Sequence, residues 1–423
     1  MNENSILTRP RAIIVGAGIG GLAAAGALSP ICDSIIILDK DKLPESAESR
    51  KSIVQANHLH SLLIGGQNIL EKYFPNITQD IVDVGGIILR AGLDQSIFEF
   101  GAWMPNRDLG LSISAQSRLL LESVLRQRVK QLNNVTILDA TRVTDIEIKK
   151  GRVCGVCINS STDSEQVISG DFVVEATGLS GTLTQKLNRL HPDIELKKEQ
   201  VNSKIVYVSA YIKKPEKWLG TKENVLIVAE PDQTCGGALL DIEDDTWVVS
   251  LNGRNGVEPP TDFEGWKNYA RQLPETAIWE RIKDCSVEHK LQKFGKSSFY
   301  LRRFDLVEDL PIGYFPLGDT INSINPTFGQ GMALALGHVE ELGEALADGF
   351  TDDAQRTYLK RATKRSQNAW RQTVTYESMF SDMDEKSRNK YKLLQSLVLN
   401  KHKQAIQDEN VHLELFKQAQ MLT

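Results

Sequence analysis

The chain has 423 residues, and this length predicts more than one domain, because a single hydrophobic core rarely grows beyond about 300 residues. Its net charge of −6 argues against nucleic acid as a partner, since neutralising phosphates requires a basic surface. Five cysteines, an odd number spread over a long chain, do not suit a disulfide framework, so we expect a reduced, cytoplasmic protein.

The first elements along the chain predict a βαβ unit. Residues 11–16 (RAIIVG) have the β-branched run of a buried strand, Ile19 to Leu28 is an alanine-rich helix, and 34–39 (SIIILD) is a second buried strand. The stretch from Ala12 to Cys32 carries no charge and has the hydropathy of a membrane span. Its three close glycines and its Ser-Pro turn nevertheless favour strand, turn and helix over a continuous span.

The remaining sequence predicts both helices and strands. Apolar residues at helical spacing run from Leu59 to Tyr73 and end at Pro75, and an amphipathic helix covers 117–132 with Ser117 as its cap. The other expected elements are strands at 135–138, 142–149, 152–159, 171–178, 204–212, 236–243, 246–252 and 313–319, and helices at 262–272, at 274–283, from Gln330, and from 352 to the end.

This order of elements predicts an α/β protein with a Rossmann-type dinucleotide-binding domain that is interrupted by a β-sheet substrate domain. A helical C-terminal segment closes the chain. The predicted cofactor domain is discontinuous and covers 10–195 plus 300–350, and 60–115 contributes partly to the substrate side. The β-rich domain covers 196–299, and the C-terminal helices cover 351–423.

A glycine-rich loop, Gly16-x-Gly18-x-x-Gly21, lies between the first strand and the first helix. Asp39 ends the second strand, 18 residues after Gly21. In a dinucleotide site these glycines permit a tight turn, close approach of the pyrophosphate, and helix–strand packing, while the acid accepts hydrogen bonds from a ribose. The loop therefore predicts binding of an ADP-containing cofactor.

A second glycine loop, GDTINSINPTFGQGM, lies three hundred residues later and distinguishes between NAD and FAD. Asp319 ends a strand, and Gly331-Met332 begins an apolar helix. A helix start with bare N–H groups stabilises the negative charge of a reduced flavin ring, and a nicotinamide dehydrogenase has no need of it. We therefore expect FAD, with Asp319 beside the ribityl chain.

Several motifs, in this order, resemble the class A flavin-dependent monooxygenases, the p-hydroxybenzoate hydroxylase-like group. They are VGAGIGG, the acid-ended second strand, SRLLLESVL, VVEATG and PLGDTINSINPTFGQGMALAL. The stretch RKSIVQANHLHSLLIGGQNILEKYFP is similar to the branch with squalene epoxidase-like and polyene epoxidase-like enzymes. The resemblance covers roughly residues 10 to 375 and implies FAD, the fold and an oxygen-inserting reaction.

The resemblance also implies roles for single residues. Those implied to bind the cofactor are Gly16, Gly18, Gly21 and Asp39 at the ADP half, Arg118 at the pyrophosphate or ribityl region, Val143 at the adenine, Arg50 near the flavin, and Asp319, Gly331 and Met332 at the flavin. The family's Asp-Gly motif for FAD and NADPH appears here as Ala176-Thr177-Gly178, which leaves direct use of NADPH open.

His58 and His60 form a His-x-His pair before a helix. No cysteine or carboxylate cluster completes a metal site around them, so we expect no metal. Two interpretations stay open for the pair: surface or packing histidines at a helix start, or, for His58, a place in the cavity beside the flavin. No other residue is assigned as catalytic, because the flavin C4a position carries the chemistry.

The function that we expect is that of an FAD-dependent monooxygenase of secondary metabolism, whose substrate is an apolar alkene or aromatic small molecule. One O2-derived oxygen enters by epoxidation or hydroxylation through a flavin C4a-hydroperoxide, with NADPH or NADH as reductant, used directly or through a flavin reductase. Any membrane contact is at most peripheral. The alternatives are a flavin-dependent reductase of the geranylgeranyl reductase type, a halogenase, although no Trp-x-Trp-x-x-Pro segment occurs, and a non-enzymatic ligand carrier.

Overall fold

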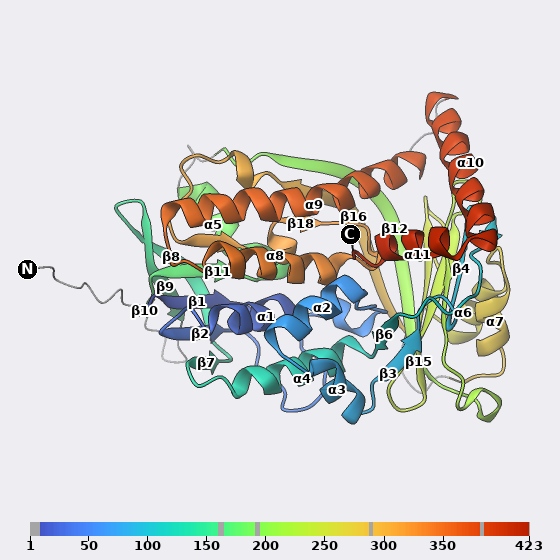
Figure 1. The fold of residues 1–423 in the computed structure, drawn as a ribbon, viewed down its shortest axis with the longest axis horizontal. Coiled ribbons are helices and arrows are strands. Elements are labelled where there is room, and N and C mark those ends of the chain that lie inside the picture. The colour runs from blue at the N-terminus through green and yellow to red at the C-terminus, as the bar shows by residue number, and fades with distance from the viewer. Residues whose placement is uncertain (1–8, 160–164, 191–194, 287–290, 381–384, 423) are drawn as a thin grey trace, which may run out of the picture.

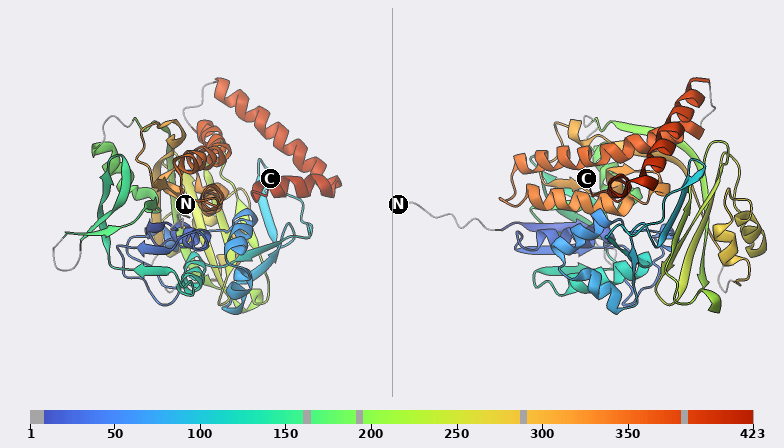
Figure 2. Two further views of the ribbon diagram at one scale, coloured as in Figure 1. Left: turned by 60° about the vertical axis from the view of Figure 1, so that its left-hand side comes forward. Right: turned by 45° about the vertical axis from the view of Figure 1, so that its right-hand side comes forward.

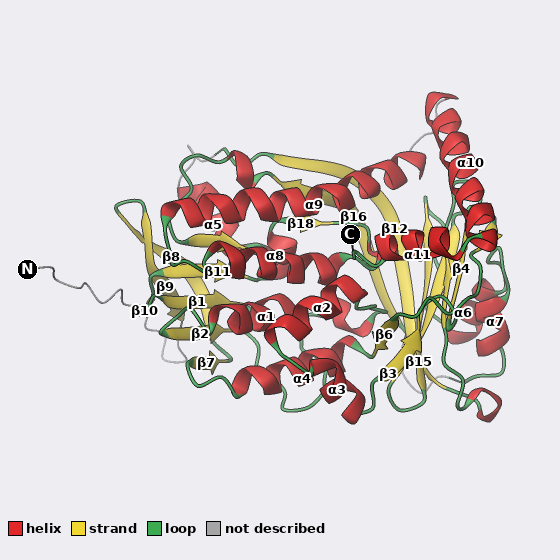
Figure 3. Cartoon of the chain, viewed as in Figure 1, coloured by secondary structure: helices red, strands yellow, loops and turns green. Residues whose placement is uncertain are grey.

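The computed structural model describes residues 9–159, 165–190, 195–286, 291–380 and 385–422. Two large sheets organise these residues, a five-stranded sheet on the left of Figure 1 and an eight-stranded sheet on the right. The long helix α9 (Asp352–Phe380) runs past both sheets and ties them together. The predicted α/β fold, with a Rossmann-type sheet, a β-sheet region and C-terminal helices, is confirmed (Figure 3).

The five-stranded sheet is parallel and has the order β17-β11-β1-β2-β7. Its strands are continuous apolar runs because both faces are covered by other elements, whose buried side chains share one core cluster with the sheet. The strands are β1 (Arg11–Val15), β2 (Ser34–Leu38), β7 (Val135–Leu138), β11 (Phe172–Glu175) and β17 (Tyr314–Pro316). The helices of this region are α1 (Ile19–Leu28), α2 (Ile64–Tyr73), α3 (Ile77–Asp83), α4 (Arg118–Lys130), α5 (Thr182–Leu190) and α8 (Gly331–Ala345).

The charge-free stretch from Ala12 to Cys32 lies at the centre of this region. β1 and α1 are buried along almost their whole length, and this burial explains the high hydropathy. Among the helices of the described residues, none combines the length and the hydropathy needed to cross a membrane.

The eight-stranded sheet has the order β18-β16-β12-β15-β14-β13-β4-β5. Along β12, Val208, Ala210 and Ile212 pack on one face with the helices α6 (Phe263–Ala270) and α7 (Ala277–Ile282), so the alternate residues face the cofactor region. The strands are β4 (Gln95–Glu99), β5 (Ala102–Trp103), β12 (Lys198–Lys213), β13 (Asn224–Ile227), β14 (Cys235–Ile242), β15 (Thr246–Arg254), β16 (Gln292–Arg302) and β18 (Asn322–Ser323).

Smaller elements complete the described fold. The strands β8 (Arg142–Lys149), β9 (Arg152–Asn159) and β10 (Glu165–Ser169) form a three-stranded sheet, and β3 (Ile87–Arg90) pairs with β6 (Ser112–Ala115). After α9 the chain continues as α10 (Glu385–Gln407) and α11 (Glu409–Ala419), which lie beside the eight-stranded sheet in Figure 1.

The structure corrects several predicted boundaries. Strand β12 begins at Lys198 rather than at 204, and β17 ends at Pro316, so Asp319 lies in a turn after the strand. Helix α2 begins at Ile64, whereas the apolar spacing predicted a helix from Leu59. Residues 58–63 are not helical; the His58 side chain contacts Ser209, and the His60 side chain bonds to the carbonyl of His58. The division into domains at the boundaries given above stays a prediction.

Candidate functional site

The first glycine loop closes the turn between β1 and α1 by backbone contact. Gly16 has a φ of +110°, and a Cβ there would lie 2.4 Å from the carbonyl oxygen of Ala176. A Cβ on Gly21 would lie 1.9 Å from the carbonyl oxygen of Gly16. Around Gly18, in contrast, a Cβ would meet no atom within 4 Å. Two glycines therefore permit the close turn, and the third keeps the space before the helix N-terminus open.

A cavity of about 380 Å³ opens in front of this loop. Three groups of residues form walls of it: Gly16 with Gly18, Arg142 with Val143, and residues 176–180 with Thr182 and Leu183. Asp39, Arg50 and Arg118 also line the cavity. Most of the residues predicted for the ADP half thus come together around one space, although they come from four separate stretches of the chain.

Asp39 and Arg50 form a buried pair at this cavity. Arg50 Nη1 lies 2.9 Å from Asp39 Oδ2, and Arg50 Nη2 lies 2.7 Å from Glu122 Oε1. The same Asp39 oxygen accepts a hydrogen bond from the Ala17 N–H at 2.8 Å. The structure therefore places Arg50 beside the ADP-side acid. The predicted contact of Asp39 with a ribose stays a prediction, and the carboxylate already holds the loop backbone.

Sequence reasoning missed Glu175, a fully buried carboxylate at the end of β11. It accepts hydrogen bonds from the backbone N–H groups of Leu183 at 2.7 Å and Thr184 at 2.9 Å, and from the Thr177 hydroxyl at 2.8 Å. Tyr314 OH also donates to it, and burial together with this carboxylate raises the pKa of Tyr314. Glu175 thereby fixes the segment that forms the third wall of the cavity. The available signal was a lone acid ending an apolar strand.

The second glycine loop is held from behind by a buried histidine of α8. The Gly318 N–H donates to His338 Nδ1 at 3.1 Å, so Nε2 carries the ring proton and donates to Ser366 Oγ at 2.9 Å. Burial lowers the pKa of His338 to about 3, which keeps the ring neutral. Because Asp319 follows Gly318, whose φ is +62°, this bond fixes the turn that presents Asp319.

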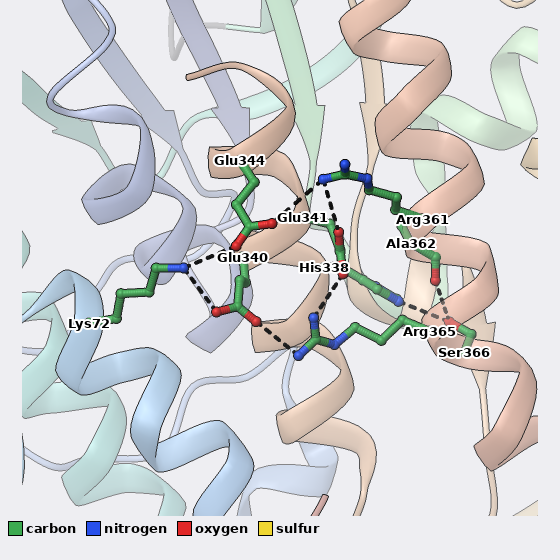
Figure 4. A network of polar contacts seen from close by, with 9 residues as sticks. All are labelled: Lys72, His338, Glu340, Glu341, Glu344, Arg361, Ala362, Arg365 and Ser366. Carbon is green, nitrogen blue, oxygen red and sulfur yellow. Dashed lines mark hydrogen bonds and ion pairs between the residues drawn. The ribbon is translucent and has the colours of Figure 1, made fainter. Parts of the chain in front are cut away.

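Ion pairs around His338 fix α8 between two other helices (Figure 4). Lys72 of α2 lies 3.0 Å from Glu340 and 3.2 Å from Glu344. Arg365 of α9 lies 2.9 Å from Glu340 and 2.9 Å from Glu341. These pairs are partly exposed, so each is weak, but together they define the position of α8 and hence of its N-terminus.

The N-terminus of α8 is open. A Cβ on Gly331 would meet no atom within 4 Å, whereas Met332 is buried in the core of the cofactor region. The first N–H groups of an α-helix have no partner within the helix. The structure thus provides the bare helix start that the sequence predicted, with Gly331 as its exposed residue.

Three charged side chains gather beside the second loop. Burial raises the pKa of Asp319, while Lys296 and Arg118 act in the opposite direction on it. Burial lowers the pKa of Lys296, and Asp319 counteracts that effect. Arg118 Nε is buried without a hydrogen-bond partner, and its Nη1 lies 3.4 Å from His60 Nε2. An unsatisfied buried guanidinium of this kind suits an anionic or acceptor-rich ligand.

Arg118 joins the two glycine loops. It lines the cavity in front of the first loop, and it interacts electrostatically with Asp319 of the second. His60 Nδ1 donates a hydrogen bond to the His58 carbonyl at 2.8 Å, so Nε2 of His60 carries no proton. Nε2 can therefore accept a hydrogen bond from Nη1 of Arg118. Burial lowers the pKa of His60 to about 3. His60 is therefore a neutral partner of Arg118, a role that the sequence did not predict.

His58 lies on the opposite side, against the eight-stranded sheet. Its Nδ1 is 2.7 Å from Ser209 Oγ, its ring centroid is 5.7 Å from that of Phe294, and its Nε2 is buried without a partner. Burial lowers its pKa to about 4. Tyr207, on the same face of β12, approaches Thr327 of the second loop at 3.4 Å. This face of the sheet thus meets the second loop.

Most aromatic side chains of residues 98–105 and 204–251 belong to the protein core. Phe98 and Trp247 are buried in the cluster on the outer face of the sheet, under α6 and α7. Two of these aromatic side chains lie toward the second loop instead. Tyr207 approaches Thr327 of that loop, and Phe100 packs in the cluster that includes Phe328. Within the described residues, no group of three His, Cys, Asp or Glu side chains could hold a metal ion.

The fit of the site to FAD rests on the two glycine loops and on Arg118 between them. The open glycine positions of both loops, and the unpaired Arg118 Nε between them, suit a cofactor with an anionic linker and a polar ring. Residues 9–376 match a family model described as "FAD binding domain". The match covers well over half of the chain, so the chain belongs to this family, and the protein is an FAD-dependent oxidoreductase, as the sequence predicted.

The chain is also similar to individual known proteins in sequence or in fold. Protein Rv3254 of Mycobacterium tuberculosis is 29% identical over 397 residues, 86% of this chain and 79% of that protein. The fold is similar to p-nitrophenol 4-monooxygenase PnpA of Pseudomonas putida DLL-E4 (TM-score 0.67, 14% identity, 97% of each chain). It is also similar to PqsL, a probable FAD-dependent monooxygenase of Pseudomonas aeruginosa (TM-score 0.66, 15% identity, 88% of this chain and 97% of that one). The flavin-dependent brominase Bmp2 gives a TM-score of 0.67 at 13% identity, over 95% and 92% of the two chains.

Proposed function

We propose that the protein is a monooxygenase that inserts one O2-derived oxygen into an apolar alkene or aromatic small molecule of secondary metabolism, by epoxidation or hydroxylation. The observation that carries this proposal is Arg118, which links the ADP-side cavity to the Asp319 loop. A protein that needed only the ADP half would not require the second loop, its open helix start and its buried charges.

The residues of this chain have separate tasks in that reaction. Gly16, Gly18 and Gly21 would shape the loop for the pyrophosphate, and Val143, which lines the cavity, would contact the adenine. Asp319 and the N–H group of Gly331 would hold the ring end. The chemistry that bound, reduced FAD supplies is the activation of O2 and the transfer of one oxygen atom to the substrate. The second oxygen leaves as water, and NADPH or NADH supplies the two electrons.

The substrate side is proposed where the inner face of β12 meets the second loop. Tyr207, Phe294 and Phe328 contribute partly buried aromatic surface there, and His58 adds a neutral ring. Apolar walls exclude water from the reacting atoms and suit an apolar substrate. The stretch from Arg50 to Pro75, which includes His58, supports the squalene epoxidase-like branch within this proposal.

Reduction by NADPH or NADH directly, or through a flavin reductase, is part of the proposal. The experiment supplies purified, FAD-loaded protein with either nucleotide, with and without a reductase, and measures O2 uptake and products with polyenes, terpenoids and aromatic polyketides under ¹⁸O2. We expect one labelled oxygen in the product. Substrate reduction without O2 uptake would instead indicate a reductase, and a halide requirement would indicate a halogenase.

A further inference from the structure

Helix α10 (Glu385–Gln407) is fixed to the body along one side. Tyr391 belongs to the buried cluster at the end of α9, and its hydroxyl donates to Glu230 at 2.8 Å. His402 Nε2 lies 3.1 Å from Glu99, and Arg107 donates to the carbonyl of Ile406 at 2.9 Å. Figure 2 shows the helix at the outer edge of the molecule. Its orientation is therefore set by contacts at both ends.

The opposite side of α10 exposes leucines between lysines. Lys386, Lys390, Leu393, Leu397 and Lys401 follow one another at spacings of three or four residues, so they share one helix face. Leu393 is 62% exposed and Leu397 is 53% exposed, and because they lie four residues apart they form one exposed apolar pair rather than two scattered side chains. This face, called the leucine–lysine face below, combines an apolar centre with cationic ends.

The charge of α10 differs from that of the whole chain. The chain carries a net charge of −6, whereas α10 has a single acid at Glu385. None of its exposed cations forms an ion pair with another described residue, and these cations are Lys386, Arg388, Lys390, Lys392, Lys401 and Lys403. A basic amphipathic helix with exposed leucines is typical of surfaces that bind anionic lipid headgroups and insert apolar side chains between them.

We propose that the leucine–lysine face docks on an anionic lipid membrane, with the helix parallel to the surface. Leu393 and Leu397 enter the boundary between headgroups and acyl chains, and the lysines contact lipid phosphates. A second copy of the chain is a poor occupant, because a symmetric contact would place these lysines against their equivalents. Nucleic acid would leave the leucines exposed to water. The lipid surface is the partner that satisfies both groups.

The position of α10 gives the docking a consequence for the substrate. Phe328 of the second loop contacts Tyr376 at 5.1 Å between ring centroids, and Tyr376 contacts Phe380 at 5.1 Å. Tyr391 of α10 belongs to the same buried cluster. An apolar path of side chains thus connects α10 to the second loop. If the proposed reaction holds, a membrane-dissolved substrate would approach from this side, but the docking itself does not depend on that reaction.

The experiment uses flotation of the FAD-loaded full chain with phosphatidylcholine vesicles, with and without phosphatidylglycerol. Two double variants remove the two parts of the face: K390E with K401E, and L393Q with L397Q. The matched control is K360E with K364E on the exposed side of α9, which makes the same change in charge. Far-ultraviolet circular dichroism and thermal melts establish that each variant folds.

We expect binding to the phosphatidylglycerol vesicles only, and weakening of about tenfold or more by either α10 variant, since each basic residue near an anionic surface contributes about 1 kcal/mol. The α9 control should bind as the unchanged protein does. Equal binding to both kinds of vesicle, equal loss in the α9 control, or no vesicle binding together with a dimer that the α10 variants dissolve would each overturn the proposal.

Discussion

The two ends of the candidate cofactor site are built in different ways. At the ADP end, backbone atoms touch, as at Gly16 and Gly21, and the charge of Arg50 is neutralised by Asp39 and Glu122. At the ring end, Asp319 lies with Lys296 and Arg118, and none of them forms a close ion pair among the described residues. The charged side chains of the ADP end neutralise one another without a ligand, whereas the charged side chains of the ring end remain available to a ligand. Changes at the closed backbone contacts of Gly16 and Gly21 should therefore damage folding, whereas changes to the charge of Asp319 should damage cofactor binding.

The largest expected effect tests the closed turn. Gly21→Ala places a Cβ against the Gly16 carbonyl and should lower the free energy of unfolding by about 3 kcal/mol through overpacking, with loss of FAD. Gly18→Ala meets open space, so it should leave the melting temperature of the apoprotein unchanged while weakening FAD binding about tenfold or more. Thermal melts and FAD titration separate the two. Equal effects of both variants on stability would contradict the described turn.

Next in size is the loss of the ring-side carboxylate. Asp319→Asn keeps the shape and removes the charge, and it should weaken FAD binding about ten- to a hundredfold, the range for a hydrogen bond to a charged group. Fluorescence titration of the apoprotein with FAD measures this. Asp309→Asn, at an exposed position in the loop before β17, is the control and should change nothing. Unchanged FAD affinity in Asp319→Asn would remove this residue from the cofactor site.

A smaller effect tests the support behind the second loop. His338→Leu leaves the buried Gly318 N–H without an acceptor and should cost about 1–3 kcal/mol of stability. His338→Gln keeps an acceptor for Gly318 and a donor for Ser366, so it should recover most of the stability and of the FAD affinity. Melting temperature and FAD content of the two variants give the comparison. If glutamine is no better than leucine, the hydrogen bond does not position the loop.

Stability should also depend on pH. Burial lowers the pKa of His338 to about 3 and that of His58 to about 4, so both stay neutral in the folded state. In the unfolded chain they bind protons below about pH 6.5, so the unfolded state gains protons as the pH falls and stability decreases from about pH 6.5 towards these values. Denaturant unfolding at pH 7 and pH 5 should show the loss, and His338→Gln should reduce it. A flat profile would mean that these rings are not neutral and buried.

The sequence predicted the parts of this molecule that depend on local patterns. The βαβ unit, the Ser117 cap and the hairpin before Thr246 have turn, cap and burial signals within a few neighbouring residues, and the structure contains all three. The early start assigned to the helix at Leu59 was wrong because apolar spacing does not reveal that His58 and His60 bond to distant or backbone partners.

Long-range contacts account for what the sequence did not predict. Glu175 accepts hydrogen bonds from the backbone N–H groups of residues 183 and 184, and His338 accepts one from the N–H group of Gly318. In each case the two partners come from separate elements. The pairing of Arg50 with Asp39 likewise depends on how the loop after β2 folds back. No spacing rule within one segment identifies such partners, because register and packing between elements bring them together.

One FAD molecule should span both loops. Isothermal titration of the apoprotein with FAD and, separately, with ADP tests it most directly, because ADP reaches only the first loop. We expect one FAD per chain, bound at least about a hundredfold more tightly than ADP, a difference of about 2.7 kcal/mol. ADP that binds as tightly as FAD would show that the Asp319 loop contributes nothing to the binding affinity, and it would contradict a cofactor held by both loops.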